Sequence, residues 1–275
     1  MRFGDQRLST NVEDRRGLGG PLMAGGGGLG VLVLALVIYL CGGDPSSLLG
    51  GGEPTGREVQ PPGTTANKTV GPDQNSNFAR QVEGSLEDTW KQILPQQARV
   101  QFRPPVLVFF TGQTRSACGA ASSATGPFYC PGDSKLYLDF AFFNELQREF
   151  KAPGDFAQAY VIAHEFGHHI QNLQGTMDKV QRAGNDNRLS VALELQADCY
   201  AGVWGYYAQK KGQVEAGDPE EAIRAAQAVG DDMIQKRTQG YVIPDSFTHG
   251  SAAQRVQYFQ KGFQSGDMRQ CQTFR

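Results

Sequence analysis

Apolar residues recur at regular intervals over most of the chain beyond residue 76. Between residues 77 and 97 every fourth residue is large and apolar, which predicts an amphipathic helix. Residues 106–110 form a continuous apolar run and residues 135–139 alternate, and both patterns predict strands. The residues between these strands, 111–132, are predicted to form a loop.

Helical periodicity dominates the remainder of the chain. It predicts helices over residues 140–150, 155 to about 173, about 189–211, 219–236 and 251–263. Pro153 and Gly154 separate the first two, and Ser251 with Gln254 forms a capping box at the start of the last. The pattern therefore predicts an α+β fold that is mostly helical with a small sheet.

The first 74 residues have a different composition. Residues 21–43 are apolar and glycine-rich, and a bilayer span needs about 20 such residues. Four arginines within residues 1–20 predict, by the positive-inside rule, a cytoplasmic tail followed by a transmembrane anchor. Residues 44–74 predict a flexible linker to a folded domain at residues 75–275. We thus expect a single-pass membrane protein with a periplasmic or extracellular domain; a cleaved signal peptide is the alternative.

Three of the four histidines lie on the helix predicted from residue 155. His164, Glu165 and His168 form the pattern H-E-x-x-H, and helix residues four apart share a face, so both imidazoles can bind one ion. Glu165 lies to the side, within reach of a metal-bound water as a general base. His169 points toward the flank of the core and is interpreted as structural. The alternative for the motif is a pair of histidines on a surface helix.

A catalytic zinc ion needs a third protein ligand and one open position. The metzincin pattern is excluded, because Gln171 and Gln174 stand where it requires glycine and histidine. Glu194 and Asp198 lie four residues apart within an apolar run, where unpaired carboxylates are costly. We predict Glu194 as the third ligand and Asp198 as the acceptor of the second N–H of one histidine. A solvated acidic face is the alternative.

Charge and cysteine content narrow the classes of protein further. The net charge is −2 and no basic block is present, which argues against a nucleic-acid partner. Four of the five cysteines lie in the predicted domain and permit two disulfides in an oxidising compartment. Proximity along the chain favours the pairs Cys118–Cys130 and Cys199–Cys271. Four free thiols are the alternative, and no pair has the spacing of a structural zinc site.

Several of these features together resemble one family. They are residues 11–17, the glycine-rich apolar segment, residues 164–169, residues 194–198 and residues 249–251. Together they resemble the bacterial neutral zinc metallopeptidase family over nearly the whole chain. The resemblance implies a zincin-like domain that binds Zn²⁺ at a gluzincin-type site. A more distant similarity to the HtpX and CAAX-protease gluzincins brings in His249 and Arg255, although Gly250 stands where that group has proline.

We therefore expect a zinc-dependent endopeptidase that acts on a peptide or protein substrate and is attached to the membrane by its N-terminal helix. Zn²⁺ would be held by His164, His168 and Glu194, with Glu165 as general base. His249 is a candidate donor to the oxyanion of the tetrahedral intermediate, and a solvent-facing loop histidine is its alternative. The strand at residues 135–139 is a candidate partner for an extended substrate.

The alternative function is a zinc-stabilised binding module at the membrane surface that cleaves nothing. The presence of Glu165 argues against such a module, because a structural zinc site has no need of a base. Nothing in the sequence indicates the oligomeric state.

Overall fold

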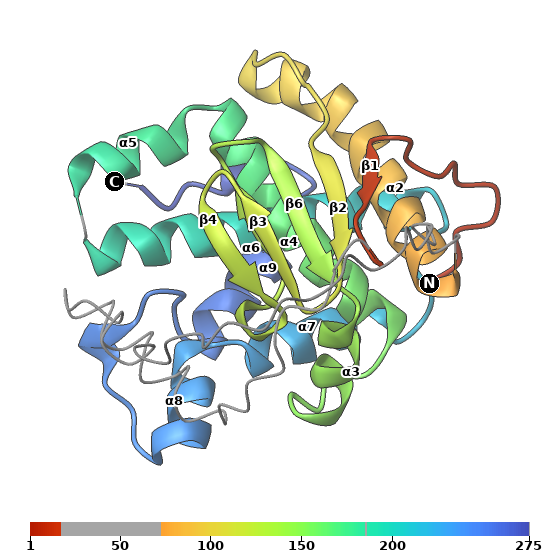
Figure 1. Ribbon diagram of the computed structural model, residues 1–275. Helices are drawn as coiled ribbons and strands as arrows, with labels where there is room; N and C mark the ends of the chain where they lie inside the picture. The colour runs from red at the N-terminus through yellow and green to blue at the C-terminus, as the bar shows by residue number, and fades with distance from the viewer. Residues whose placement is uncertain (18–72, 185, 275) are drawn as a thin grey trace, which may run out of the picture. The chain divides into compact units, whose positions relative to one another are not determined.

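The computed structural model describes residues 1–17, 73–184 and 186–274 (Figure 1). Residues 1–17 and the described residues from Asp73 onward belong to one folded unit. The predicted anchor at residues 21–43 and nearly all of the predicted linker at residues 44–74 lie outside the described residues. Among the residues that are described, no helix has the length and apolar character of a membrane span.

Four strands form the main sheet in the order β1–β2–β6–β5. They are β1 (Val12–Asp14), β2 (Val106–Phe110), β6 (Lys135–Asp139) and β5 (Phe128–Cys130). β1, β2 and β6 run parallel to one another, and β5 is antiparallel to β6. β2 is apolar throughout because both of its faces are covered. Leu107 and Phe109 pack with the helices in the main core, whereas Val108 and Phe110 belong to a smaller cluster.

The N-terminal residues take part in this sheet, because β1 pairs with Leu107–Phe109 of β2. Arg16 is buried, and its guanidinium lies 5.4 Å from the ring centroid of Phe109. Residues 1–17, which were predicted to form a separate tail, are therefore part of the folded unit.

The region predicted as a loop, residues 111–132, contains a hairpin of β3 (Gln113–Ser116) and β4 (Gly119–Ser122), a 3₁₀ turn η2 (Ser123–Thr125) and β5. The loop prediction is wrong here because these strands are short and rich in small and polar residues, which leaves no apolar alternation. A disulfide between Cys118 and Cys130 joins the turn of the hairpin to β5.

β1 and β5 are the two edge strands of the sheet, and β6 is an inner strand. β6 lies between β2 and β5 and is hydrogen-bonded to both. The expectation that residues 135–139 pair with a substrate is therefore wrong, because both sides of that strand are already paired.

Eight α-helices are found in the described residues, and they confirm a mostly helical α+β fold with a small sheet. They are α2 (Gln74–Ala98), α3 (Ala141–Arg148), α4 (Asp155–Leu173), α5 (Thr176–Ala183), α6 (Asn187–Lys210), α7 (Asp218–Ala228), α8 (Asp231–Gln239) and α9 (Ala252–Ser265). Two 3₁₀ turns, η3 (Pro244–Ser246) and η4 (Met268–Gln270), flank α9. The capping box predicted at Ser251 is present.

The single helix predicted over residues 219–236 is wrong, because the chain turns at Gly230 between α7 and α8. A Cβ atom on Gly230 would lie 2.4 Å from the backbone nitrogen of Ala252. The backbone at the start of α9 therefore approaches too closely for any other residue, and the helical pattern is interrupted there by tertiary packing.

α4 and α6 pack closely against each other near the centre of the domain (Figure 1). A Cβ atom on Gly167 would lie 2.9 Å from the carbonyl oxygen of Ala197. The glycine between the two histidines is therefore required for this helix contact. Cys199, on α6, forms a disulfide with Cys271, so both predicted disulfides are present. The contact places the residues after Gly167 on α4 opposite those before Ala197 on α6.

Candidate metal centre

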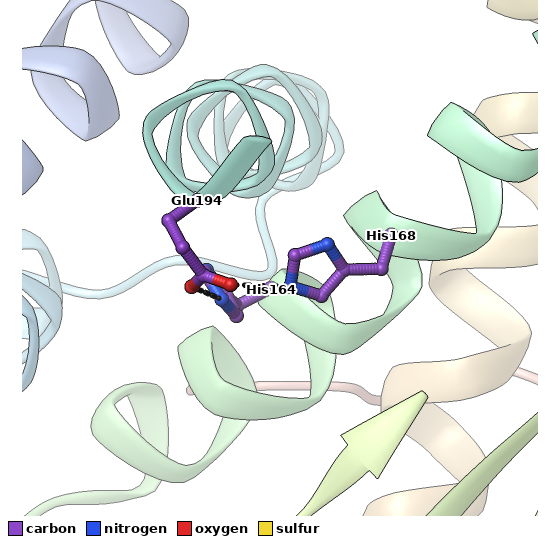
Figure 2. A group of neighbouring side chains, drawn as sticks. All are labelled: His164, His168 and Glu194. Carbon is purple, nitrogen blue, oxygen red and sulfur yellow. Dashed lines mark hydrogen bonds and ion pairs between the residues drawn. The ribbon is translucent and has the colours of Figure 1, made fainter. Parts of the chain in front are cut away.

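The three predicted metal ligands come together from two facing helices (Figure 2). His164 and His168 project from α4 and Glu194 from α6, and one ligand atom of each lies within 4.8 Å of the others. The Nε2 atom of His164 is 3.1 Å from one carboxylate oxygen of Glu194, and that of His168 is 3.4 Å from the other. Two imidazole nitrogens and a carboxylate oxygen are a donor set that suits Zn²⁺.

The second nitrogen of each imidazole is already engaged. Nδ1 of His164 lies 2.8 Å from Oδ1 of Asp198, and Nδ1 of His168 lies 2.8 Å from Oε1 of Gln171. A carboxylate or amide oxygen only accepts, so in the neutral imidazole Nδ1 carries the hydrogen and Nε2 keeps a free lone pair. Both lone pairs then face Glu194, which is the arrangement that a metal ion requires. The residues present therefore fit a zinc ion.

Asp198 is held by a buried network of charged and hydroxyl groups. Arg255, from α9, donates from Nε to one carboxylate oxygen at 2.8 Å and from Nη2 to the other at 2.9 Å. The Tyr160 hydroxyl donates at 2.5 Å. Burial alone would raise the pKa of Asp198, but Arg255 and His164 together outweigh this effect and the pKa is lowered. Asp198 is therefore ionised and accepts from His164, the role predicted for it from its spacing.

The electrostatic field at the three ligands favours positive charge. Burial alone would lower the pKa of His164, but Asp198 reverses the effect and raises that pKa to about 10. Burial likewise opposes ionisation of Glu194, yet the charge of His168 holds the pKa of this carboxyl well below its usual value. A site that stabilises a proton this strongly also stabilises a divalent cation that replaces it.

Glu165 and His249 lie on the walls of the same cleft, which has a volume of about 420 Å³ and also exposes the three predicted ligands. Glu165 is half-buried and is not one of the three grouped ligands. Burial raises its pKa above the usual value, against the opposing charge of His168. The cleft therefore brings a carboxylate with an elevated pKa beside the candidate metal ligands.

His249 stands at the turn before α9, with half of its side chain exposed. Its Nδ1 lies 3.1 Å from Oδ1 of Asp231, and the other oxygen of Asp231 accepts the backbone N–H groups of Thr248, His249 and Gly250. The hydrogen bond to Asp231 raises the pKa of His249. His249 is thus an oriented, half-exposed side chain that lines the cleft. Sequence reasoning missed Asp231, because it lies 18 residues away with no recognisable spacing.

His169 lies in the core, away from the other histidines of its helix. Its Nε2 is 2.7 Å from the carbonyl oxygen of Arg103 and its Nδ1 is 3.0 Å from the hydroxyl of Tyr129. Burial lowers its pKa to about 4. The residue is therefore a neutral, hydrogen-bonded core histidine, in agreement with its interpretation as structural.

Comparison with known proteins finds one family model and several relatives that match most or all of the chain. A family model described as "Putative neutral zinc metallopeptidase" matches residues 1–274. "Uncharacterized protein YpfJ" of Escherichia coli K12 is 45% identical over 289 residues, which cover 100% of this chain and 99% of that protein. "Uncharacterized protein Rv2575" of Mycobacterium tuberculosis H37Rv is 46% identical over 202 residues, which cover 69% of this chain and 67% of that protein. No solved structure matches the chain.

Proposed function

The chain belongs to the neutral zinc metallopeptidase family, and we propose that it is a zinc-dependent endopeptidase with a gluzincin-type site. The observation that carries this proposal is the convergence of His164, His168 and Glu194 beside a cleft that also holds Glu165. These three residues would hold the ion. Zinc, when bound, supplies Lewis acidity that polarises the scissile carbonyl and acidifies the attacking water.

Glu165 is the general base of the proposed reaction. Its raised pKa lies closer to neutrality than that of an ordinary carboxyl, which matches the requirement for moving a proton in both directions. The carboxylate takes a proton from the attacking water and later passes it to the leaving amine. Glu165 is also the feature that separates this proposal from a zinc-stabilised binding module, which has no use for a base.

His249 stabilises the oxyanion that develops on the substrate. Asp231 engages Nδ1, which leaves Nε2–H as the donor on the exposed side of the ring. A donor fixed in advance by a carboxylate loses little free energy to reorientation during the reaction. The electrostatic support from Asp231 keeps this donor positively charged over a wider pH range than a free histidine.

An extended peptide binds along β5 in the proposed complex. Phe128 and Tyr129 of β5 line the cleft, and among the described strands β5 pairs only with β6. A free strand edge hydrogen-bonds to a peptide backbone without regard to side chains. The nearby walls are mostly apolar and predict a preference for apolar substrate side chains: Pro127, Phe128, Phe142, Met177, Leu193 and Val229.

We also propose that the domain works outside the cytoplasm, in the periplasm or beyond. Two disulfides support this, because such bonds persist in oxidising compartments. Since residues 1–17 belong to the domain, the proposal places that segment in the same compartment.

The test compares the purified full-length chain with its Glu165→Gln variant, both supplied with zinc, against a complex protein mixture. Cleavage products are identified by mass spectrometry of the new chain termini. Glutamine keeps the size of the side chain but cannot accept the proton, so cleavage should fall by about 10²–10⁴-fold while zinc content and thermal stability stay unchanged.

Two results would overturn the proposal. Cleavage by Glu165→Gln at the wild-type rate would show that the base lies elsewhere. Absence of cleavage by both zinc-loaded proteins would favour the binding module.

A further inference from the structure

Gln171, which excludes the metzincin pattern in the sequence, contacts the metal site directly in the structure. It lies three residues after His168 on α4, and its side chain is completely buried. Its Oε1 atom is 2.8 Å from Nδ1 of His168. Residues three apart are neighbours on a helix surface, so the contact needs no unusual backbone geometry.

One backbone carbonyl and the side chain of Gln196 fix the orientation of this amide. Nε2 of Gln171 donates to the carbonyl oxygen of Leu193 at 2.7 Å and to Oε1 of Gln196 at 3.2 Å. Gln196 is itself fixed, because its Nε2 donates to the carbonyl oxygen of Cys271 at 3.0 Å. A backbone carbonyl can only accept, so both amides must point in one direction, and Oε1 of Gln171 must face His168.

We propose that Gln171 and Gln196 form an amide relay that positions His168 as a zinc ligand. The relay sets the tautomer with hydrogen on Nδ1 and leaves the lone pair of Nε2 facing Glu194. Its two anchors are the backbone of α6 at Leu193 and the C-terminal segment at Cys271. Gln171 and Gln196 are positioning residues, and the assignment rests on the proposed role of His168 in metal binding.

The relay also fixes the spacing between the two helices that carry the ligands. Leu193 immediately precedes Glu194, so the hydrogen bond from Gln171 ties the backbone next to one ligand to the ring of another. The far end is held covalently, because Cys271 is joined to Cys199 of α6. Both ends of the relay are therefore attached to α6.

The relay consists of uncharged amides, which is favourable at a site that already contains several carboxylates. Glu194 and Glu165 already bring two carboxylates to the site, and the buried Asp198 is compensated by Arg255. A further carboxylate at residue 171 would be buried among amide and backbone groups without a guanidinium partner, which is costly. An amide supplies the same acceptor atom without that charge.

The test uses Gln171→Met, Gln196→Met and the matched control Gln174→Met in the full-length chain. Methionine removes the amide and approximately keeps the volume. Gln174 follows the last residue of the same helix, and its side chain accepts from the hydroxyl of Tyr200 instead of from a metal ligand. Zinc affinity, measured by competition with a chromophoric chelator, should fall by about 10–100-fold in Gln171→Met. Gln196→Met should show a smaller loss, and Gln174→Met should match the wild type.

A second readout follows the imidazole without metal. Long-range ¹H–¹⁵N spectra of the zinc-free protein, taken at a pH at which the ring of His168 is neutral, report which of its nitrogens carries hydrogen. His168 should change from the Nδ1–H form to a mixture in Gln171→Met, while the spectrum of His164 stays unchanged because Asp198 is untouched. If Gln171 only stabilised the fold, its substitution would not change the spectrum of the His168 ring alone.

The relay is overturned if His168 keeps the Nδ1–H form and its zinc affinity in Gln171→Met, or if Gln174→Met weakens zinc binding equally. If Gln171→Met does not fold, the same two readouts on Gln196→Met decide the question. A wild-type protein that cleaves nothing contradicts the proposed function, whereas the tautomer of His168 still decides on the relay.

Discussion

The two candidate histidine ligands are supported in different ways. His164 is held by an ion pair, in which the buried Asp198 is neutralised by Arg255. His168 is held by two neutral amides that end on backbone carbonyls. In both arrangements the lone pair of Nε2 faces Glu194. A charged partner at His164 and a neutral partner at His168 therefore produce the same ligand geometry. We call the support of His164 the ionic side and the support of His168 the amide side. The stability of the protein should depend strongly on each partner of the ionic side, because removing one member of a buried ion pair leaves an uncompensated charge.

The largest effect should come from breaking the ion pair. Arg255→Met leaves Asp198 buried without its main partner, and we expect a loss of about 3–5 kcal/mol in the free energy of unfolding. Chemical denaturation of the full-length chain measures it. Arg269→Met is the matched control, because Arg269 pairs with Asp267 at the exposed surface and its loss should change the free energy of unfolding little. Equal losses in the two variants would contradict the contrast between the ionic and amide sides.

A smaller effect on stability, but a large one on metal binding, is expected from Asp198→Asn. Arg255 needs an acceptor, so the new amide should turn its oxygen to the guanidinium and its NH₂ group toward His164. That orientation favours the wrong tautomer, and zinc affinity should fall by about 10–100-fold. Asp267→Asn serves as the surface control. Unchanged zinc affinity in Asp198→Asn would show that a neutral partner suffices on this side as well.

The pH dependence of activity should reveal the second ionic contact, between His249 and Asp231. Because Asp231 raises the pKa of His249, the imidazolium persists to higher pH than in a free histidine. The stabilisation from this pair is complete below the unfolded pKa of about 6.5 and is lost as pH rises through the raised folded value. Asp231→Asn should therefore move the alkaline limb of kcat/KM to lower pH. A limb that stays in place would remove His249 from the proposed mechanism.

The smallest effect is expected at Tyr160, which adds a third hydrogen bond to Asp198. Tyr160→Phe removes only the hydroxyl, and Arg255 and His164 still engage the carboxylate. We expect a loss of about 1 kcal/mol in unfolding free energy, with zinc affinity nearly unchanged. Differential scanning calorimetry and chelator competition measure the two quantities. A loss in zinc affinity as large as that in Asp198→Asn would show that the ion pair alone does not fix the carboxylate.

The difference between the ionic and the amide side also explains which site residues could be predicted from the sequence. Glu194 and Asp198 were detectable because carboxylates within an apolar run are costly unless paired. Gln171 carried no such signal, since a glutamine on a helix is ordinary until its partners are known, although its spacing of three from His168 was available. Asp231 could not be identified, because its contact with His249 depends on where α8 and α9 meet.

The same reasoning applies to the fold. Helices with strong periodicity, such as α2 and α4, were predicted close to their observed bounds. β1 was missed because a three-residue strand with two acidic side chains looks like a polar tail. Its charges are instead satisfied within the domain, where Glu13 pairs with Arg15 and Lys135. Short strands that depend on distant partners leave no periodic pattern.

The metal content of the purified full-length chain tests the central claim most directly. Wild type and the surface control Glu220→Ala should each bind about one zinc ion per chain after incubation with zinc and removal of the excess. Glu194→Ala should lose most of the zinc, because the two remaining imidazoles hold the ion poorly. Full zinc content in Glu194→Ala, or none in the wild type, would contradict a site built from His164, His168 and Glu194.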